Sequence, residues 1–352
     1  MVGFSVVTTT LTMNKPYPSD DTQKHFDEGI DLTPELIQTF EERVARDVAE
    51  PLILNRSPEI TSFAEVHARG LVSSGGRQTL LMMAAVEFGE QGVIKFLLGT
   101  GVDPEETCAE GKTALMHAAK HRLAGAVFEL LERGALVNTR NSQDSSTALM
   151  CAAEQDENTA VIYMLLQAGA AVNAVNADGE TALHVACAAS RADECFLLIC
   201  NGADIFARDN EGNTPLHVAC REDGVMEIAL IMVHLGGDIY AVNNEGESAM
   251  HISVFASGGF ATLLGPASTG AIEALMGLDP TLANVFNNDG DMPIHLYARE
   301  GWTPGVEQLA AVGGSMSVPN SKGETPAQIA SDAGEEETLL AITTALAEQQ
   351  RK

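Results

Sequence analysis

A six-residue pattern of polar and apolar positions recurs along most of the chain. Each copy opens with Thr, Ser or Met, continues with Pro, Ala or Leu, and then carries apolar side chains at helical spacing. The copies begin at Thr79, Thr113, Thr147, Thr181, Thr214, Ser248, Met292 and Thr325. Successive copies are 34, 34, 34, 33, 34, 44 and 33 residues apart, and this regularity indicates a repeat protein.

Each repeat predicts two helices and a tight turn. A Thr before Pro or Ala favours the start of a first helix, because its hydroxyl can cap the helix and Pro suits the first turn. A second apolar segment follows, as at 161–166, and Gly169 ends it. Turns with Asn or Asp first and Gly fourth come next, at 176–179, 209–212, 243–246, 287–290 and 320–323. No unit can bury its own apolar face, so neighbouring units must stack into a solenoid.

The recurring cassette resembles the Thr-Pro-Leu-His-x-Ala motif of the ankyrin repeat. Thr214 to Ala219 match it at every fixed position, and Gly202-Ala203-Asp204 matches the turn that follows the second helix in that family. The resemblance covers roughly residues 75–350. It implies an all-α solenoid of stacked helix–turn–helix units, joined by turns that resemble β-hairpins.

The ends of the chain and one long step depart from the repeat. We expect a flexible segment over 1–30, a helical N-terminal cap over 31–74 and the repeat domain over 75–352. The 44-residue step places an insertion near 257–268, which either folds back on its own repeat or contacts a partner. A C-terminal capping helix is predicted to open at Glu335, where acidic residues favour the helix dipole.

One position of the second helix is apolar in four consecutive repeats, where the ankyrin family usually has a charged residue. It is occupied by Phe128, Tyr163, Phe196 and Leu230. An exposed apolar row on the outer face would mark an interface, whereas helix tilt would bury it between repeats. The predicted helix 34–50 could also cover it, with an apolar face made of Leu36, Ile37, Phe40, Val44 and Val48. A covered row predicts a monomer, which is the state we expect, and an uncovered row predicts a dimer.

Composition limits the classes of partner. The 352 residues include 20 Lys and Arg against 49 Asp and Glu, and residues 178–352 contribute −18 of the net charge of −29. This charge disfavours nucleic acid as a partner and predicts a basic partner segment over the later repeats, with solubility as the competing explanation. The chain contains no run of 18 apolar residues, so no membrane span is predicted. The N-terminal residues show no secretory signal pattern, so an intracellular location is expected.

The residues that could carry chemistry fit structural roles better. His184, His217, His251 and His295 recur once per repeat, where the ankyrin family uses His to hydrogen-bond the turn backbone. The six cysteines show no Cys-x-x-Cys spacing, and no nucleotide-binding or catalytic motif is present. We therefore expect no enzymatic activity, no cofactor and no metal.

What remains is binding of another protein, in the manner of an adaptor or scaffold. Similar arrays bind through a concave groove formed by the turn tips and the inner ends of the first helices. The corresponding positions are Lys120, His121, Arg140, Asn141, Glu154, Gln155, Asn176, Arg208, Asn210, Arg221, Glu222, Asn243, Asn244, Phe255, Phe286, Arg299 and Glu300. Trp302 is either a further aromatic anchor or a buried residue. The alternatives are a regulatory subunit whose residues 1–75 carry a separate targeting or enzymatic activity, and a secreted bacterial effector delivered into a host cell.

Overall fold

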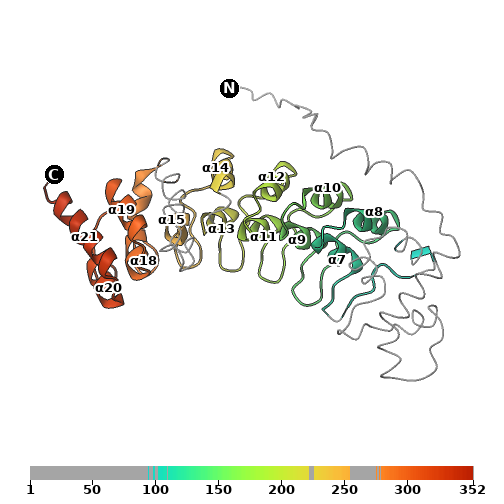
Figure 1. Ribbon diagram of the computed structural model, residues 1–352, viewed down its shortest axis with the longest axis horizontal. Helices are drawn as coiled ribbons and strands as arrows, with labels where there is room; N and C mark the ends of the chain where they lie inside the picture. The colour runs from blue at the N-terminus through green and yellow to red at the C-terminus, as the bar shows by residue number, and fades with distance from the viewer. Residues whose placement is uncertain are drawn as a thin grey trace, which may run out of the picture. The chain divides into compact units, whose positions relative to one another are not determined.

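Figure 1 shows a computed structural model of the chain. The structure describes Ile94 and residues 98–99, 102–108, 110–221, 226–253, 275, 277 and 279–351, all within the unit Ala64–Lys352. The predicted segments 1–30 and 31–74, the helix 34–50, the first cassette at Thr79 and the insertion near 257–268 lie outside the described residues. The division of the chain into these domains therefore stays a prediction.

Paired helices follow one another along the described part of the chain. The pairs are α7 (Ala114–Lys120) with α8 (Ala124–Glu132), α9 (Ala148–Ala153) with α10 (Thr159–Gln167), α11 (Ala182–Ala188) with α12 (Ala192–Cys200), α13 (Pro215–Arg221) with α14 (Met226–His234), α18 (Pro293–Arg299) with α19 (Thr303–Ala311), and α20 (Pro326–Ala333) with α21 (Glu336–Gln349). Between α14 and α18 come α15 (Ala249–Ile252) and the short 3₁₀ helix η6 (Pro280–Asn284).

These helices form two layers. The first helices α7, α9, α11, α13 and α15 pack side by side, as do the second helices α8, α10, α12 and α14, and the turns project from the first layer on the side away from the second (Figure 1). In the same way α18 packs on α20, and α19 on α21. The described residues form no strand, and their one bridge joins Val242 and Ser248. The structure confirms the all-α repeat solenoid, and no described helix is long and apolar enough to cross a membrane.

The predicted helix starts are present. Thr113, Thr147 and Thr181 have extended backbones, and each hydroxyl accepts a hydrogen bond from the backbone N–H three residues on, at 3.4 Å. Thr325 starts α20 with a full capping box. Its hydroxyl accepts a hydrogen bond from the backbone N–H of Gln328, and the Gln328 side-chain oxygen accepts one from the backbone N–H of Thr325. Such a cap contributes about 1 kcal/mol to helix stability, which matters for helices this short.

Four histidines join each repeat to the next. In each, Nδ1 accepts a hydrogen bond from the backbone N–H at the start of its own helix, and Nε2 donates to a carbonyl of the following repeat. The acceptors are Asn213 O for His184 (3.1 Å), Glu247 O for His217 (3.2 Å), Asp291 O for His251 (3.1 Å) and Val318 O for His295 (3.0 Å). Burial lowers the pKa of all four imidazoles, that of His251 to about 4, so the neutral form prevails at pH 7. Their predicted structural role is confirmed.

Among the described residues, the core is built mostly from aliphatic side chains, with one aromatic pair. Leu115, Leu149 and Leu183 of three successive first helices are buried, among alanines that let the helices approach closely. In the seventh repeat Tyr297 and Trp302 meet edge to face, with ring centroids 4.8 Å apart. Trp302 is buried at the start of α19, so it belongs to the core and is no anchor for a partner.

Candidate partner-binding surface

The first residue of each four-residue turn shapes the turn from within. Its Oδ1 accepts hydrogen bonds from the backbone N–H groups two and four residues on, at 3.0 and 2.9 Å for Asn176 and at 3.0 and 2.9 Å for Asn243. Asp209, Asn287 and Asn320 do the same in their turns. Asn176 and Asn243 therefore hold the backbone, and their Oδ1 atoms are already occupied.

The second residue of the turn ties each tip to the one before it. The Nδ2 groups of Asn210, Asn244 and Asn288 donate to the backbone carbonyls of Ala177, Asn210 and Asn244, at 2.8, 2.9 and 3.0 Å. The backbone N–H groups of the same three residues donate to Asp178, Glu211 and Glu245, at 2.8, 2.8 and 3.0 Å. This hydrogen-bonded ladder continues across the 44-residue step. It occupies the side-chain and backbone N–H groups of the predicted contact residues Asn210 and Asn244.

The third residue of the turn is exposed and acidic in four of the turns. It is Asp178, Glu211, Glu245 and Asp289 in four successive turns, all exposed, and we call these the acidic tip row. Gly follows each of them because the fourth position has a positive φ, for example +79° at Gly179, where a Cβ would also lie 2.8 Å from the backbone nitrogen of Asn210. This row was not predicted from the sequence, although an acidic residue precedes Gly at the same place in all four turns.

Apolar side chains lie next to the acidic tip row. The residue before each turn is Val175, Val242 or Phe286 in three of the repeats, and the Phe286 side chain is 53% exposed. Arg140 and Arg208 occupy the same position in two others, both exposed. Arg208 Nη1 donates to the carbonyls of Gly212 and Val242, at 2.8 and 2.7 Å, so it also joins two tips.

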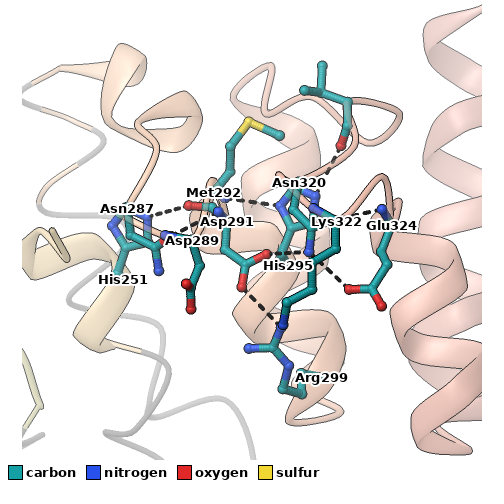
Figure 2. A network of polar contacts seen from close by, with 11 residues as sticks. His251, Asn287, Asp289, Asp291, Met292, His295, Arg299, Asn320, Lys322 and Glu324 are labelled. Carbon is teal, nitrogen blue, oxygen red and sulfur yellow. Dashed lines mark hydrogen bonds and ion pairs between the residues drawn. The ribbon is translucent and has the colours of Figure 1, made fainter. Parts of the chain in front are cut away.

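The fold uses two of the predicted contact residues internally, and the prediction is wrong for Asn141, which is buried. Asn141 is buried, with its Oδ1 accepting from the backbone N–H of Gln143 at 2.9 Å. Arg299 pairs with the buried carboxylate of Asp291 at 3.0 Å, and Asn320 Nδ2 donates to the other oxygen of that carboxylate at 2.8 Å (Figure 2). Arg299 therefore balances the buried charge of Asp291, while its own side chain is 41% exposed, so its predicted contact role stays a prediction.

The inner helix ends are only partly available. Lys120 and Glu154 form an ion pair of 3.5 Å between neighbouring repeats. His121, Glu154, Arg221 and Glu300 are exposed, and Lys120 and Gln155 are partly buried. Glu222 and Phe255 lie outside the residues whose side chains the structure describes.

The predicted outer-face residues keep their alignment. Phe128, Tyr163 and Phe196 stand at the fifth position after the residue that starts each second helix, and they are 47%, 50% and 47% exposed. Leu230 of α14 is partly buried. Helix tilt therefore does not bury the first three side chains.

The charge along the turn tips is mainly negative. Burial, with Glu245 and Asp289 nearby, raises the pKa of Glu247 above its ordinary value. No group of three or more potential metal ligands exists among the described residues. The surface therefore offers carboxylates spread along a row rather than gathered at one point.

A family model for ankyrin repeats in three copies matches residues 60–141, 124–209 and 188–266, which together exceed half of the chain. The chain belongs to the ankyrin repeat family. An ankyrin repeat protein of fowlpox virus (strain NVSL) is 35% identical over 108 residues, a segment that covers 30% of this chain and 31% of the viral protein. The match thus spans less than a third of that relative. Ankyrin repeats are in general protein–protein interaction modules and typically lack enzymatic activity.

Proposed function

We propose that this ankyrin repeat chain is a non-enzymatic module that binds a protein partner along its turn tips. The observation that carries the proposal is the acidic tip row, because four exposed carboxylates recur at one position of successive turns that the ladder holds in register. The apolar side chains of Val175, Val242 and Phe286 lie beside them. A partner segment that alternates Lys or Arg with apolar residues fits this surface.

The rigidity of the tips supports binding. Each tip is fixed by backbone and side-chain hydrogen bonds to its neighbour, so a partner does not have to order a loop. Exposed ion pairs contribute about 0.4 kcal/mol each, so four of them contribute about 1.6 kcal/mol and roughly a tenfold change in affinity.

A displayed peptide library selects the partner class directly. We expect enriched peptides to combine basic and apolar residues, and their affinity to fall between about 50 mM and about 500 mM salt. The variant Asp178→Asn, Glu211→Gln, Glu245→Gln, Asp289→Asn should bind them roughly tenfold more weakly.

A matched control separates this row from net charge. The variant Glu132→Gln, Asp193→Asn, Glu307→Gln, Glu348→Gln removes the same four charges from exposed positions on second helices. It should bind as the unmodified chain does. Enrichment of peptides without basic residues, or equal loss in both variants, would contradict the proposal. An intracellular location, delivery into a host cell and a separate activity in residues 1–75 stay predictions from the sequence.

A further inference from the structure

The helices that carry the turns set the spacing of the acidic tip row. The turns of Asp178, Glu211 and Glu245 lead into α11, α13 and α15, and these first helices pack side by side. Helices in contact lie roughly 8–10 Å apart. The hydrogen bonds between tips hold the turns to the same interval and extend it to Asp289. The row therefore presents one carboxylate about every 8–10 Å.

The row has a defined length, and the charge changes sign at its C-terminal end. In the turn before the row, Asp144 is partly buried and its Oδ1 accepts from the backbone N–H of Ser146 at 2.9 Å. After the row, the ladder continues to the next turn, where the backbone N–H of Ser321 donates to Asp289 O at 3.3 Å. The third residue of that turn is Lys322, which is exposed. Four exposed carboxylates are thus followed by an ammonium group.

The interval between carboxylates restricts the backbone of a partner segment. A polyproline II segment returns to the same face every third residue, after about 9.3 Å, which matches the row. A β-strand returns after two residues, about 6.7 Å, or four, about 13 Å, so it falls out of step. Seven residues of an α-helix span about 10.5 Å, which also matches approximately.

The residues beside the row distinguish the two conformations that match. A partner helix docks by laying an apolar stripe into a continuous apolar groove. The residues before the four turns are Val175, Arg208, Val242 and Phe286, so a charged side chain interrupts the apolar flank. A polyproline II segment needs no continuous stripe, and it loses little conformational entropy because it is formed before binding. The flank therefore favours the extended segment.

We propose that the partner segment lies along the tips in a polyproline II conformation, with Lys or Arg at every third position over the acidic tip row and an acidic residue over Lys322. About ten residues cover the four carboxylates, and about thirteen reach Lys322. This inference rests on the proposed function and adds the conformation, spacing and end of the segment.

Peptides of identical composition test the spacing. A spaced peptide repeats Lys-Pro-Val four times and ends in Glu, and a clustered peptide gathers its lysines at one end. The clustered lysines reach about two carboxylates at once, and each exposed ion pair contributes about a factor of two. Fluorescence anisotropy with the full chain at about 50 mM salt should therefore show the spaced peptide binding roughly fourfold more tightly.

Matched controls assign this difference to the tips. The variant without the four tip carboxylates should lose the fourfold difference, whereas the variant that lacks four carboxylates on second helices should keep it. A helical peptide with Lys at every seventh position should bind more weakly than the spaced peptide. Unchanged circular dichroism spectra check that the exposed substitutions leave the fold intact.

A charge reversal tests the end of the segment. The spaced peptide is made with its end residue at either terminus, because the segment can run in either direction. The better of the two should bind about fourfold more tightly with Glu than with Lys at that end. Lys322→Glu should reverse this preference. Arg351→Glu makes the same charge change at an exposed position on the last turn of the chain and should leave it unchanged.

The outcomes separate this inference from the proposed function. Equal affinity of spaced and clustered peptides, tighter binding of the helical peptide, or an end preference that Lys322→Glu does not alter would overturn the inference alone. Failure of every basic peptide to bind would contradict the proposed function as well.

Discussion

Aromatic side chains are scarce in this chain, and its two described regions use them in opposite ways. In the repeats formed by α7 to α12, Phe128, Tyr163 and Phe196 lie on the outer surface above a core of aliphatic side chains. In the repeat formed by α18 and α19, Tyr297 and Trp302 are buried against each other and Glu307 takes the outer position. The first region therefore leaves its aromatic side chains exposed, whereas the second buries them, where they stabilise the core.

The loops between paired helices also differ between the two regions, in the residue that adopts a left-handed backbone. In the earlier repeats Arg122, Glu157 and Ser190 have φ values of +60°, +51° and +58° just before the second helix starts. Gly301 and Gly334 occupy this position in the later repeats. A left-handed backbone strains side-chain-bearing residues more than glycine, so the later repeats are locally better suited to their fold.

The largest expected effect comes from the aromatic pair. Trp302→Ala opens a cavity beside Tyr297 and should lower the free energy of unfolding by about 3–5 kcal/mol. Tyr163→Ala removes a half-exposed ring and should cost less than about 1 kcal/mol. Urea denaturation measures both. Equal losses would show that the two regions do not differ in how they use aromatic side chains.

The histidine links should make stability depend on pH. The folded pKa of His251 is about 4, below the unfolded value of about 6.5, so the stability it provides is present above pH 6.5 and is lost as pH falls toward 4. The shift corresponds to as much as about 3 kcal/mol. Gln328 caps α20 without such a group, so His251→Gln should remove this part of the pH dependence.

The measurement is the free energy of unfolding of both chains between pH 7 and pH 4. The unmodified chain should be the more stable one at pH 7, and its advantage should shrink as pH falls. Carboxylate titration is common to both and cancels in the difference. A gap that is constant with pH would contradict the assignment. His184→Gln, in the earlier region, should shift in the same direction because burial also lowers that pKa.

A smaller effect separates a fully buried carboxylate from a half-buried one. Asp291→Asn leaves Arg299 without its buried counter-charge and should cost about 1–2 kcal/mol. Glu129→Gln breaks the half-buried pair between Glu129 of α8 and Arg133, which lies just after that helix, and should cost less than about 0.5 kcal/mol. Thermal unfolding at matched pH and salt compares the two. A loss at Glu129 as large as that at Asp291 would remove the contrast.

The smallest effects concern the left-handed loop residues. A Cβ on Gly334 would meet nothing within 4 Å, so Gly334→Ala isolates the backbone cost and should destabilise by about 1 kcal/mol. Glu157→Gly removes the same strain and should raise stability by about 0.5 kcal/mol. Differential scanning calorimetry should show melting temperatures that move in opposite directions. A lower melting temperature for Glu157→Gly would show that its side-chain contacts outweigh the strain.

Local spacing was enough to predict much of the fold. Thr181 and His184 lie three residues apart on one helix turn, so their reciprocal capping follows from the cassette alone. The hydrogen bonds that occupy the side chains of Asn210 and Arg299 could not be predicted from local spacing. Asn210 donates to a carbonyl of the preceding turn tip, and Arg299 donates to a carboxylate at the start of its own helix. The alignment of Phe128, Tyr163 and Phe196 on the second helices was predicted, but their exposure was not, because helix tilt decides it.

The hydrogen-bonded ladder of turn tips is continuous even where one repeat is longer than the others. Asn288 donates both its backbone and its side-chain N–H to the tip formed by Asn244 and Glu245, although 44 residues rather than 33 or 34 separate these turns. Glu245 and Asp289 therefore stand on neighbouring turn tips, and their spacing depends on the number of repeats between them rather than on the number of residues. Residues can therefore be inserted within a repeat while neighbouring turn tips keep their hydrogen bonds and their spacing.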